Sequence, residues 1–251
     1  DKADRLHKLS EAIGKDWGFT AEEAADADRA AFLSKSDLAT GMVTEFTELQ
    51  GEMGKEYALL DGEKPEVAQA IFEQYMPRFA GDILPQQEIG RALSLADKLD
   101  NLAATFLRGL IPTGSQDPFA LRRQTIGAVN ILTDGKIHWD IRRGIEAALA
   151  LLPGDEETKK TVLSQIEDFF RQRIKAIMLD EGIAYDIIDA VLAGPVDDIY
   201  ALFLKARSMA ESQLKDEAEL RQAVTRLANI TKGKTGGKVD PSLFTEDVEK
   251  E

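Results

Sequence analysis

Residues 112–123, Pro-Thr-Gly-Ser-Gln-Asp-Pro-Phe-Ala-Leu-Arg-Arg, are the most specific stretch of this sequence. The proline and glycine at the start of this stretch are typical of a turn. Asp117 can accept the free amide hydrogens of a helix's first turn, and Pro118 suits the first helical position because its missing N–H would be unpaired there. We therefore predict a helix that begins at Asp117 and carries two adjacent arginines, Arg122 and Arg123.

These two arginines are predicted to face different surroundings. At about 100° per residue, Arg122 falls in the arc of the apolar side chains of the helix, whereas Arg123 lies at the flank of that arc. A buried cation without a partner costs several kcal/mol, so Arg122 needs a carboxylate or a phosphate. Asp97 and Asp100 are the carboxylates that the preceding helix offers. An internal salt bridge and a ligand contact both stay open for Arg122, while Arg123 is freer to reach a ligand.

Composition limits the classes of protein to consider. The 251 residues, 43% of them hydrophobic, suffice for one large or two modest domains. The absence of cysteine excludes disulfides and thiolate metal sites. No apolar run reaches about 18 residues and no basic start precedes an apolar stretch, so we predict no membrane partner and a cytoplasmic location. Because the sequence starts at Asp1 and ends in an acidic run, we expect a piece of a longer protein.

Charge is distributed unevenly along the chain. The formal net charge is −14, yet residues 77–143 hold nine Lys and Arg against seven Asp and Glu. An acidic chain opposes loose, non-specific binding of a polyanion, although cations that converge locally can still bind one. A basic site inside this chain would therefore make a structured and selective contact.

The periodicity of apolar residues predicts an all-α protein. Thr20 and Glu23 form the pattern of a capping box, which starts a helix. From Ser36 or Asp37 a single helix is expected to bury Leu38 and the apolar residues that follow it. A flexible loop is predicted over 232–238. The expected helices cover about 1–14, 21–34, 36–50, 65–74, 87–108, 117–134, 140–152, 156–180, 184–193, 196–212 and 215–231.

The helix predicted over 87–108 carries a polar stripe as well as an apolar one. Arg91, Lys98 and Arg108 recur in this stripe at steps typical of one helix face. A solvated surface is the ordinary interpretation of such a stripe. The arginine-bearing helix next along the chain favours a ligand-binding interpretation instead.

Five blocks of this sequence are distinctive, namely residues 35–40, 45–54, 75–82, 96–100 and 112–123. In this order they resemble the beta subunit of the bacterial two-subunit glycyl-tRNA synthetase. A weaker similarity continues through residues 168–173, 189–193 and 226–230 to 239–244. The resemblance covers almost the whole chain, as an internal piece of a longer subunit.

The resemblance implies a helical domain like those of the HD superfamily over residues 1–152. It implies a helical linking region over 153–251 that leads into an anticodon-binding domain. In that family the alpha subunit activates glycine, using ATP and magnesium, and the beta subunit captures the tRNA. The implied partners are therefore tRNA(Gly) and the alpha subunit, with no DNA, and no cofactor is expected in this chain itself.

HD hydrolases hold their metals with one histidine, a His-Asp pair and a distant aspartate, because ions that activate water need several fixed ligands. Asp97 resembles the distant aspartate. His7 and His138 belong to no His-Asp pair, and Gln74 stands where the relatives usually have a histidine. We therefore predict no metal site and no catalytic residue. A metal-dependent phosphohydrolase or nucleotide sensor, and a purely structural helical spacer, stay open as alternatives.

The sequence-based prediction for the site is a set of phosphate contacts. A-form RNA hides its major-groove base edges from side chains, so cations would hold the acceptor arm of the tRNA through its backbone and shape. Asp97 and Asp100 are predicted to have a structural role, as pairing partners of cations. The predicted RNA-binding residues are Arg78, Arg91, Lys98, Arg108, Arg122 and Arg123.

Overall fold

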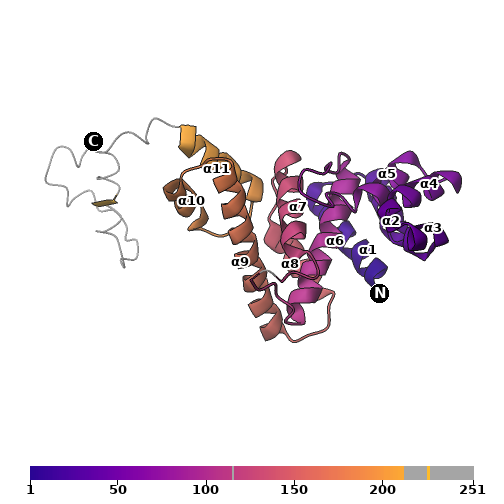
Figure 1. The fold of residues 1–251 in the computed structure, drawn as a ribbon, viewed down its shortest axis with the longest axis horizontal. Helices are drawn as coiled ribbons and strands as arrows, with labels where there is room; N and C mark the ends of the chain where they lie inside the picture. The colour runs from indigo at the N-terminus through magenta and orange to yellow at the C-terminus, as the bar shows by residue number, and fades with distance from the viewer. Residues whose placement is uncertain (115, 212–224, 227–251) are drawn as a thin grey trace. The chain divides into compact units, whose positions relative to one another are not determined.

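A computed structural model describes residues 1–114, 116–211 and 225–226, and residues 1–208 form one compact unit. Every regular element in the described part of the chain is a helix (Figure 1), which confirms the all-α prediction there. The likeness to the HD superfamily and the domain boundary after residue 152 stay predictions. The loop predicted over 232–238, and all but two residues of the helix predicted over 215–231, lie outside the described residues.

Several helices lie where the sequence predicts them. Thr20 and Glu23 form the predicted capping box, and the helices predicted over 87–108 and 156–180 are present as α6 and α9. The elements are α1 (Lys2–Trp17), α2 (Ala21–Leu33), η1 (Ser36–Ala39), α3 (Gly41–Glu45), η2 (Thr47–Leu49), α4 (Glu52–Leu60), α5 (Pro65–Glu73), α6 (Glu88–Leu107), α7 (Leu121–Asp134), α8 (Ile141–Ala150), α9 (Glu156–Asp180), α10 (Tyr185–Leu192) and α11 (Ile199–Glu211).

Helix α6 is the centre of the compact unit. It packs against α1, α2, α5, α7, α8 and α9, and Figure 1 shows it between these helices. A helix with apolar side chains on several faces is stable only when neighbours cover those faces. Leu93, Leu95, Leu99, Leu102 and Phe106 of α6 are accordingly buried. No helix in the described part of the chain is long and apolar enough to cross a membrane.

The single helix predicted from residue 36 is wrong, because the segment is divided into η1, α3 and η2. Buried Asp37 accepts hydrogen bonds from the backbone N–H of Gly51 at 2.8 Å and from the hydroxyl of Tyr75 at 3.0 Å. Thr40 caps α3 through its side chain. Such side-chain bonds compete with a continuous helix. Leu38, predicted to be buried, is 46% exposed.

Helix α7 begins at Leu121, four residues later than predicted. The Asp117 carboxylate does cap it, since it accepts hydrogen bonds from the backbone N–H groups of Leu121 at 2.8 Å and Arg122 at 2.9 Å. Ala120, however, has a φ of 54°, in the left-handed region, and this residue interrupts the helix that Asp117 would otherwise start. Pro118 therefore lies before the helix instead of in its first turn.

Candidate functional site

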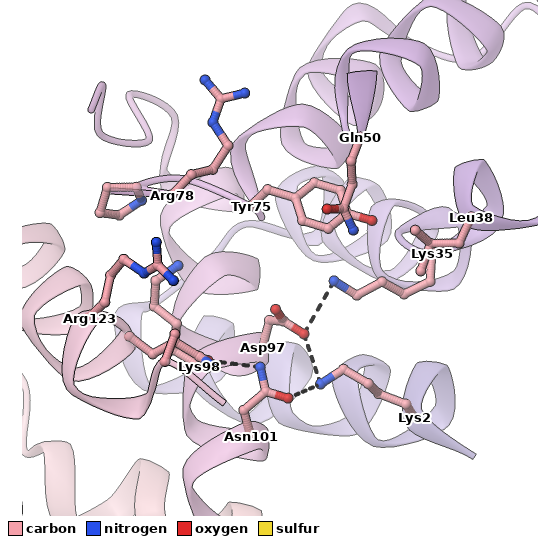
Figure 2. Close-up of a pocket in the computed structure, with 13 residues that line it drawn as sticks. Lys2, Lys35, Leu38, Gln50, Tyr75, Arg78, Asp97, Lys98, Asn101 and Arg123 are labelled. Carbon is pink, nitrogen blue, oxygen red and sulfur yellow. Dashed lines mark hydrogen bonds and ion pairs between the residues drawn. The ribbon is translucent and has the colours of Figure 1, made fainter. Parts of the chain in front are cut away.

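A hollow of about 550 Å³ lies where α1, α6 and α7 meet the segments after α2 and α5 (Figure 2). We call it the α6 pocket. Helix α6 contributes Asp97, Lys98 and Asn101 to its wall. Five cations line the pocket, namely Lys2, Lys35, Arg78, Lys98 and Arg123.

Asp97 is the carboxylate that lines the α6 pocket. Its Oδ1 lies 3.0 Å from Nζ of Lys2 and 3.3 Å from Nζ of Lys35. Burial acts to raise the pKa of Asp97, but the charges of Lys35 and Lys2 outweigh it and hold the pKa below its usual range. Burial lowers the pKa of Lys35, against the attraction of Asp97. Asp97 is therefore a carboxylate at neutral pH and holds two ammonium groups beside the pocket.

Asp100 joins α6 to α1. Its Oδ1 accepts from Nε of Arg5 at 2.6 Å, and its Oδ2 accepts from Nη2 of Arg5 at 3.0 Å and from Nζ of Lys2 at 3.2 Å. The predicted structural role of Asp97 and Asp100 as pairing partners fits this geometry, but their cationic partners come from α1 and from Lys35.

The salt bridge considered between Arg122 and these aspartates is not formed. The Arg122 guanidinium folds back along the preceding loop and donates to the carbonyl oxygen of Gly114 at 2.7 Å. Because α1 lies alongside α6, its Lys2 and Arg5 reach the carboxylates that were one of the two alternatives for Arg122. Arg122 is half-buried, while Arg123 is exposed, so the two arginines do differ in the predicted direction.

Lys98 is buried, although the sequence placed it on a polar stripe. Its ammonium donates to the carbonyl oxygen of Met76 and to Oγ of Ser94, both at 2.7 Å. Burial lowers the pKa of Lys98 to about 8. Lys98 thus fastens the segment after α5 to α6, and at neutral pH it adds a positive charge to the wall of the α6 pocket.

Arg78 and Arg123 bring the most exposed cations to the pocket. Arg78 Nε lies 3.0 Å from Oδ2 of Asp82, which itself lies outside the pocket lining. In the part of the chain that the structure describes, Arg123 has no ion-pair partner. Of the six predicted RNA-binding residues, the structure therefore brings Arg78, Lys98 and Arg123 together.

The other three predicted residues do not line the pocket. Arg91 Nε donates to the carbonyl oxygen of Pro85 at 3.0 Å, and its Nη2 lies 3.3 Å from Oδ2 of Asp134. Arg108 is exposed at the C-terminal end of α6, and Arg122 binds the loop as described. Arg91 and Arg122 are engaged in structural contacts, whereas Arg108 projects from a different part of α6.

Lys2 and Lys35 are members of the site that were not predicted from the sequence. Both come from residues 1–76, where acidic residues outnumber basic ones. A count of charge along the sequence therefore gives no reason to look for a basic site there. Lys35 opens the first block of the family resemblance, so that block offered a pointer to it. Nothing in the sequence marks Lys2.

The residues of the α6 pocket do not fit a divalent metal ion. Two lysines occupy the side of Asp97 that a metal would approach, and metals of this kind need several oxygen or nitrogen ligands. His7 and His138 pair instead with Asp28 and Asp198. Across residues 1–114, 116–211 and 225–226, no three His, Asp or Glu side chains gather as a metal site would require. The arrangement suits an anion.

Comparison with known proteins identifies the family. The model of the family described as Glycyl-tRNA synthetase beta subunit matches residues 1–193. Over 99% of its length the chain is 48% identical to the glycine--tRNA ligase beta subunit of Clostridioides difficile (strain 630), of which it covers 36%. It is 43% identical over its whole length to the same subunit of Desulforamulus reducens, of which it covers 37%. The chain thus spans little more than a third of the length of these relatives, and it belongs to the glycyl-tRNA synthetase beta subunit family.

Proposed function

We propose that this chain is a tRNA-binding part of the beta subunit of glycine-tRNA ligase. In this proposal it positions tRNA(Gly) in the cytoplasm for aminoacylation by the alpha subunit, which supplies the ATP and magnesium chemistry. Family membership and the names of the relatives support the enzyme. The observation that carries the tRNA contact is the convergence of five cations on one pocket in a chain of net charge −14.

The electrostatics of the chain favour binding at this one region. A net negative protein repels RNA except where its cations converge, and neutralisation of phosphates supplies most of the sequence-independent affinity. Arg78 and Arg123 can reach backbone phosphates because their guanidinium groups are the more exposed of the five. Lys98 contributes its charge from inside the wall. Such contacts orient an RNA without reading its sequence.

A binding experiment at two salt concentrations tests this function. The full-length subunit, assembled with the alpha subunit, is compared with its Arg78→Gln/Arg123→Gln double variant for binding of tRNA(Gly). Loss of two phosphate contacts should weaken binding and reduce the slope of log affinity against log salt by about two. Lys205→Gln, on the exposed side of α11, is the matched control. A double variant with the affinity and the salt slope of the wild type would overturn the proposal.

A further inference from the structure

The α6 pocket holds more positive than negative charge. Three carboxylates, Asp82, Asp97 and Asp100, form ion pairs with the cations that line it. Five cations against three carboxylates leave an excess of two positive charges. The charge excess is centred on Lys98 and Arg123, because Lys98 donates only to neutral oxygens and Arg123 has no carboxylate partner among the described residues.

The cations surround the hollow from opposite sides. In Figure 2, Lys2 and Lys35 point toward Asp97 from one side, and Arg123 rises on the other. Asp97 keeps the two lysine ammonium groups together, so their positions are fixed before any ligand arrives. Binding of an anion then requires little further ordering of these side chains, so less of the interaction free energy is lost as conformational entropy. A compact anion, which itself needs little ordering, benefits most.

The excess of charge selects among phosphate ligands. A phosphate monoester carries about −1.5 to −2 charges at pH 7 because its second pKa is near 6, whereas a diester within an RNA chain carries a single charge. We propose that the α6 pocket binds the terminal phosphate monoester of a nucleotide. Where this nucleotide is the 5′ end of an RNA, the proposal deepens the tRNA-binding function and rests on it. A free mononucleotide carries the same phosphate monoester.

The size and lining of the hollow agree with a single nucleotide. Its volume of about 550 Å³ lies in the range of small-ligand sites and leaves no room for a duplex. The side-chain amide of Gln50 lines the wall, and an amide can pair with the edge of a base. The amides of Asn101 and Gln124 line it too, but they are bonded to each other at 2.8 Å and hold the wall in place. The ring of Tyr75 and the side chain of Leu38 add apolar surface beside the cations.

The test compares ligands that differ by one phosphate. The full-length subunit with its alpha subunit is titrated with tRNA(Gly) bearing a 5′-monophosphate and with the same RNA bearing a 5′-hydroxyl. It is also titrated with AMP and GMP and with the corresponding nucleosides. Removal of the 5′-phosphate should weaken RNA binding about tenfold, the worth of one good charge-assisted contact.

Variants separate this pocket from other phosphate contacts. In Arg123→Gln and in Lys35→Gln the two RNAs should bind with equal affinity, whereas Lys8→Gln, on the exposed side of α1, should keep the tenfold difference. Arg123 is exposed and its variant should fold as the wild type does, which thermal unfolding checks. If AMP or GMP binds in an Arg123-dependent way while the RNAs do not differ, the source is a free nucleotide and the monoester site stands.

Two further outcomes distinguish this inference from the proposed function. If tRNA(Gly) binds with the salt dependence expected above, but neither the 5′-phosphate nor a mononucleotide matters, the monoester site is overturned and the tRNA-binding function survives. If tRNA(Gly) does not bind while a mononucleotide does, the monoester site survives and the tRNA-binding function fails.

Discussion

Asp97 and Asp100 lie three residues apart on α6, close enough to share one face of the helix, yet they serve different regions of the molecule. Asp100 accepts hydrogen bonds from both Arg5 and Lys2, and its contacts join α6 to α1. Asp97 contacts two ammonium groups and lies at the edge of the α6 pocket. An aspartate therefore stabilises the fold at position 100 and organises a charged site at position 97. Both carboxylate oxygens of Asp100 accept hydrogen bonds, whereas the ion pairs of Asp97 are made by Oδ1.

The largest effect is expected when the α1–α6 junction is broken. Asp100→Asn removes a buried carboxylate, 2% exposed, that binds Arg5 and Lys2 together, which should lower the free energy of unfolding by about 3 kcal/mol. Urea denaturation followed by circular dichroism measures this change. A loss no larger than that of an exposed surface substitution would show that α1 is held by its apolar face alone.

Asp97→Asn is the matched comparison. The side chain of Asp97 is 13% exposed, against 2% for Asp100, so water can reach the lysines that Asp97 leaves behind and the loss of stability should be smaller, about 1 to 2 kcal/mol. If Asp97→Asn destabilised the protein more than Asp100→Asn does, the assignment of the two roles would be reversed.

Because Lys98 is buried, the free energy of unfolding is expected to depend on pH in the alkaline range. Burial lowers its pKa to about 8, while the unfolded chain keeps the proton until about pH 10.4. Below pH 8 both states are protonated and the cost of burying the charge is fully present. As the pH rises from 8 toward 10.4, only the folded state releases the proton, so the stability contributed by Lys98 rises.

The measurement compares the wild type with Lys98→Met, which replaces the four-atom apolar stem of lysine and lacks its ammonium group. Between pH 7.5 and 10 the free energy of unfolding of the wild type should rise by about 2 kcal/mol relative to the variant. Asp97 and Lys35 also act on the pKa of Lys98, in opposite directions, and both are retained in the comparison. A difference that does not change with pH would mean that Lys98 is solvated in solution.

Local sequence could predict much of this fold, and its failures have tertiary causes. Helices α2 and α9 follow from capping residues and apolar periodicity, and α6 follows from periodicity alone, and both signals act within one element. The division of residues 36–49 depends on Asp37, whose partners Gly51 and Tyr75 come from elsewhere in the chain. No pattern within the segment indicates those partners.

The candidate site shows the same limit. Arg78, Lys98 and Arg123 all lie in the one segment with a positive balance, so the count of charges along the chain pointed to them. Lys2 meets Asp97 across 95 positions of sequence, and this contact exists only because α1 packs on α6. Lys98, which the sequence places on a polar stripe, is buried for a related reason, since Met76 and Ser94 offer its ammonium two buried acceptors.

The smallest effects separate the two adjacent arginines. Arg122→Gln removes the hydrogen bond to the Gly114 carbonyl oxygen and should cost about 1 kcal/mol of stability. Arg123→Gln removes no such contact within the described residues and should change stability by less than about 0.5 kcal/mol. Binding should respond in the opposite order, because Arg123 lines the α6 pocket and Arg122 does not. Urea denaturation of both variants measures their loss of stability, and titration with tRNA(Gly) measures their loss of affinity. If one variant loses both stability and affinity, the two arginines do not have separate roles. The loop that Arg122 contacts would then contribute to ligand binding as well.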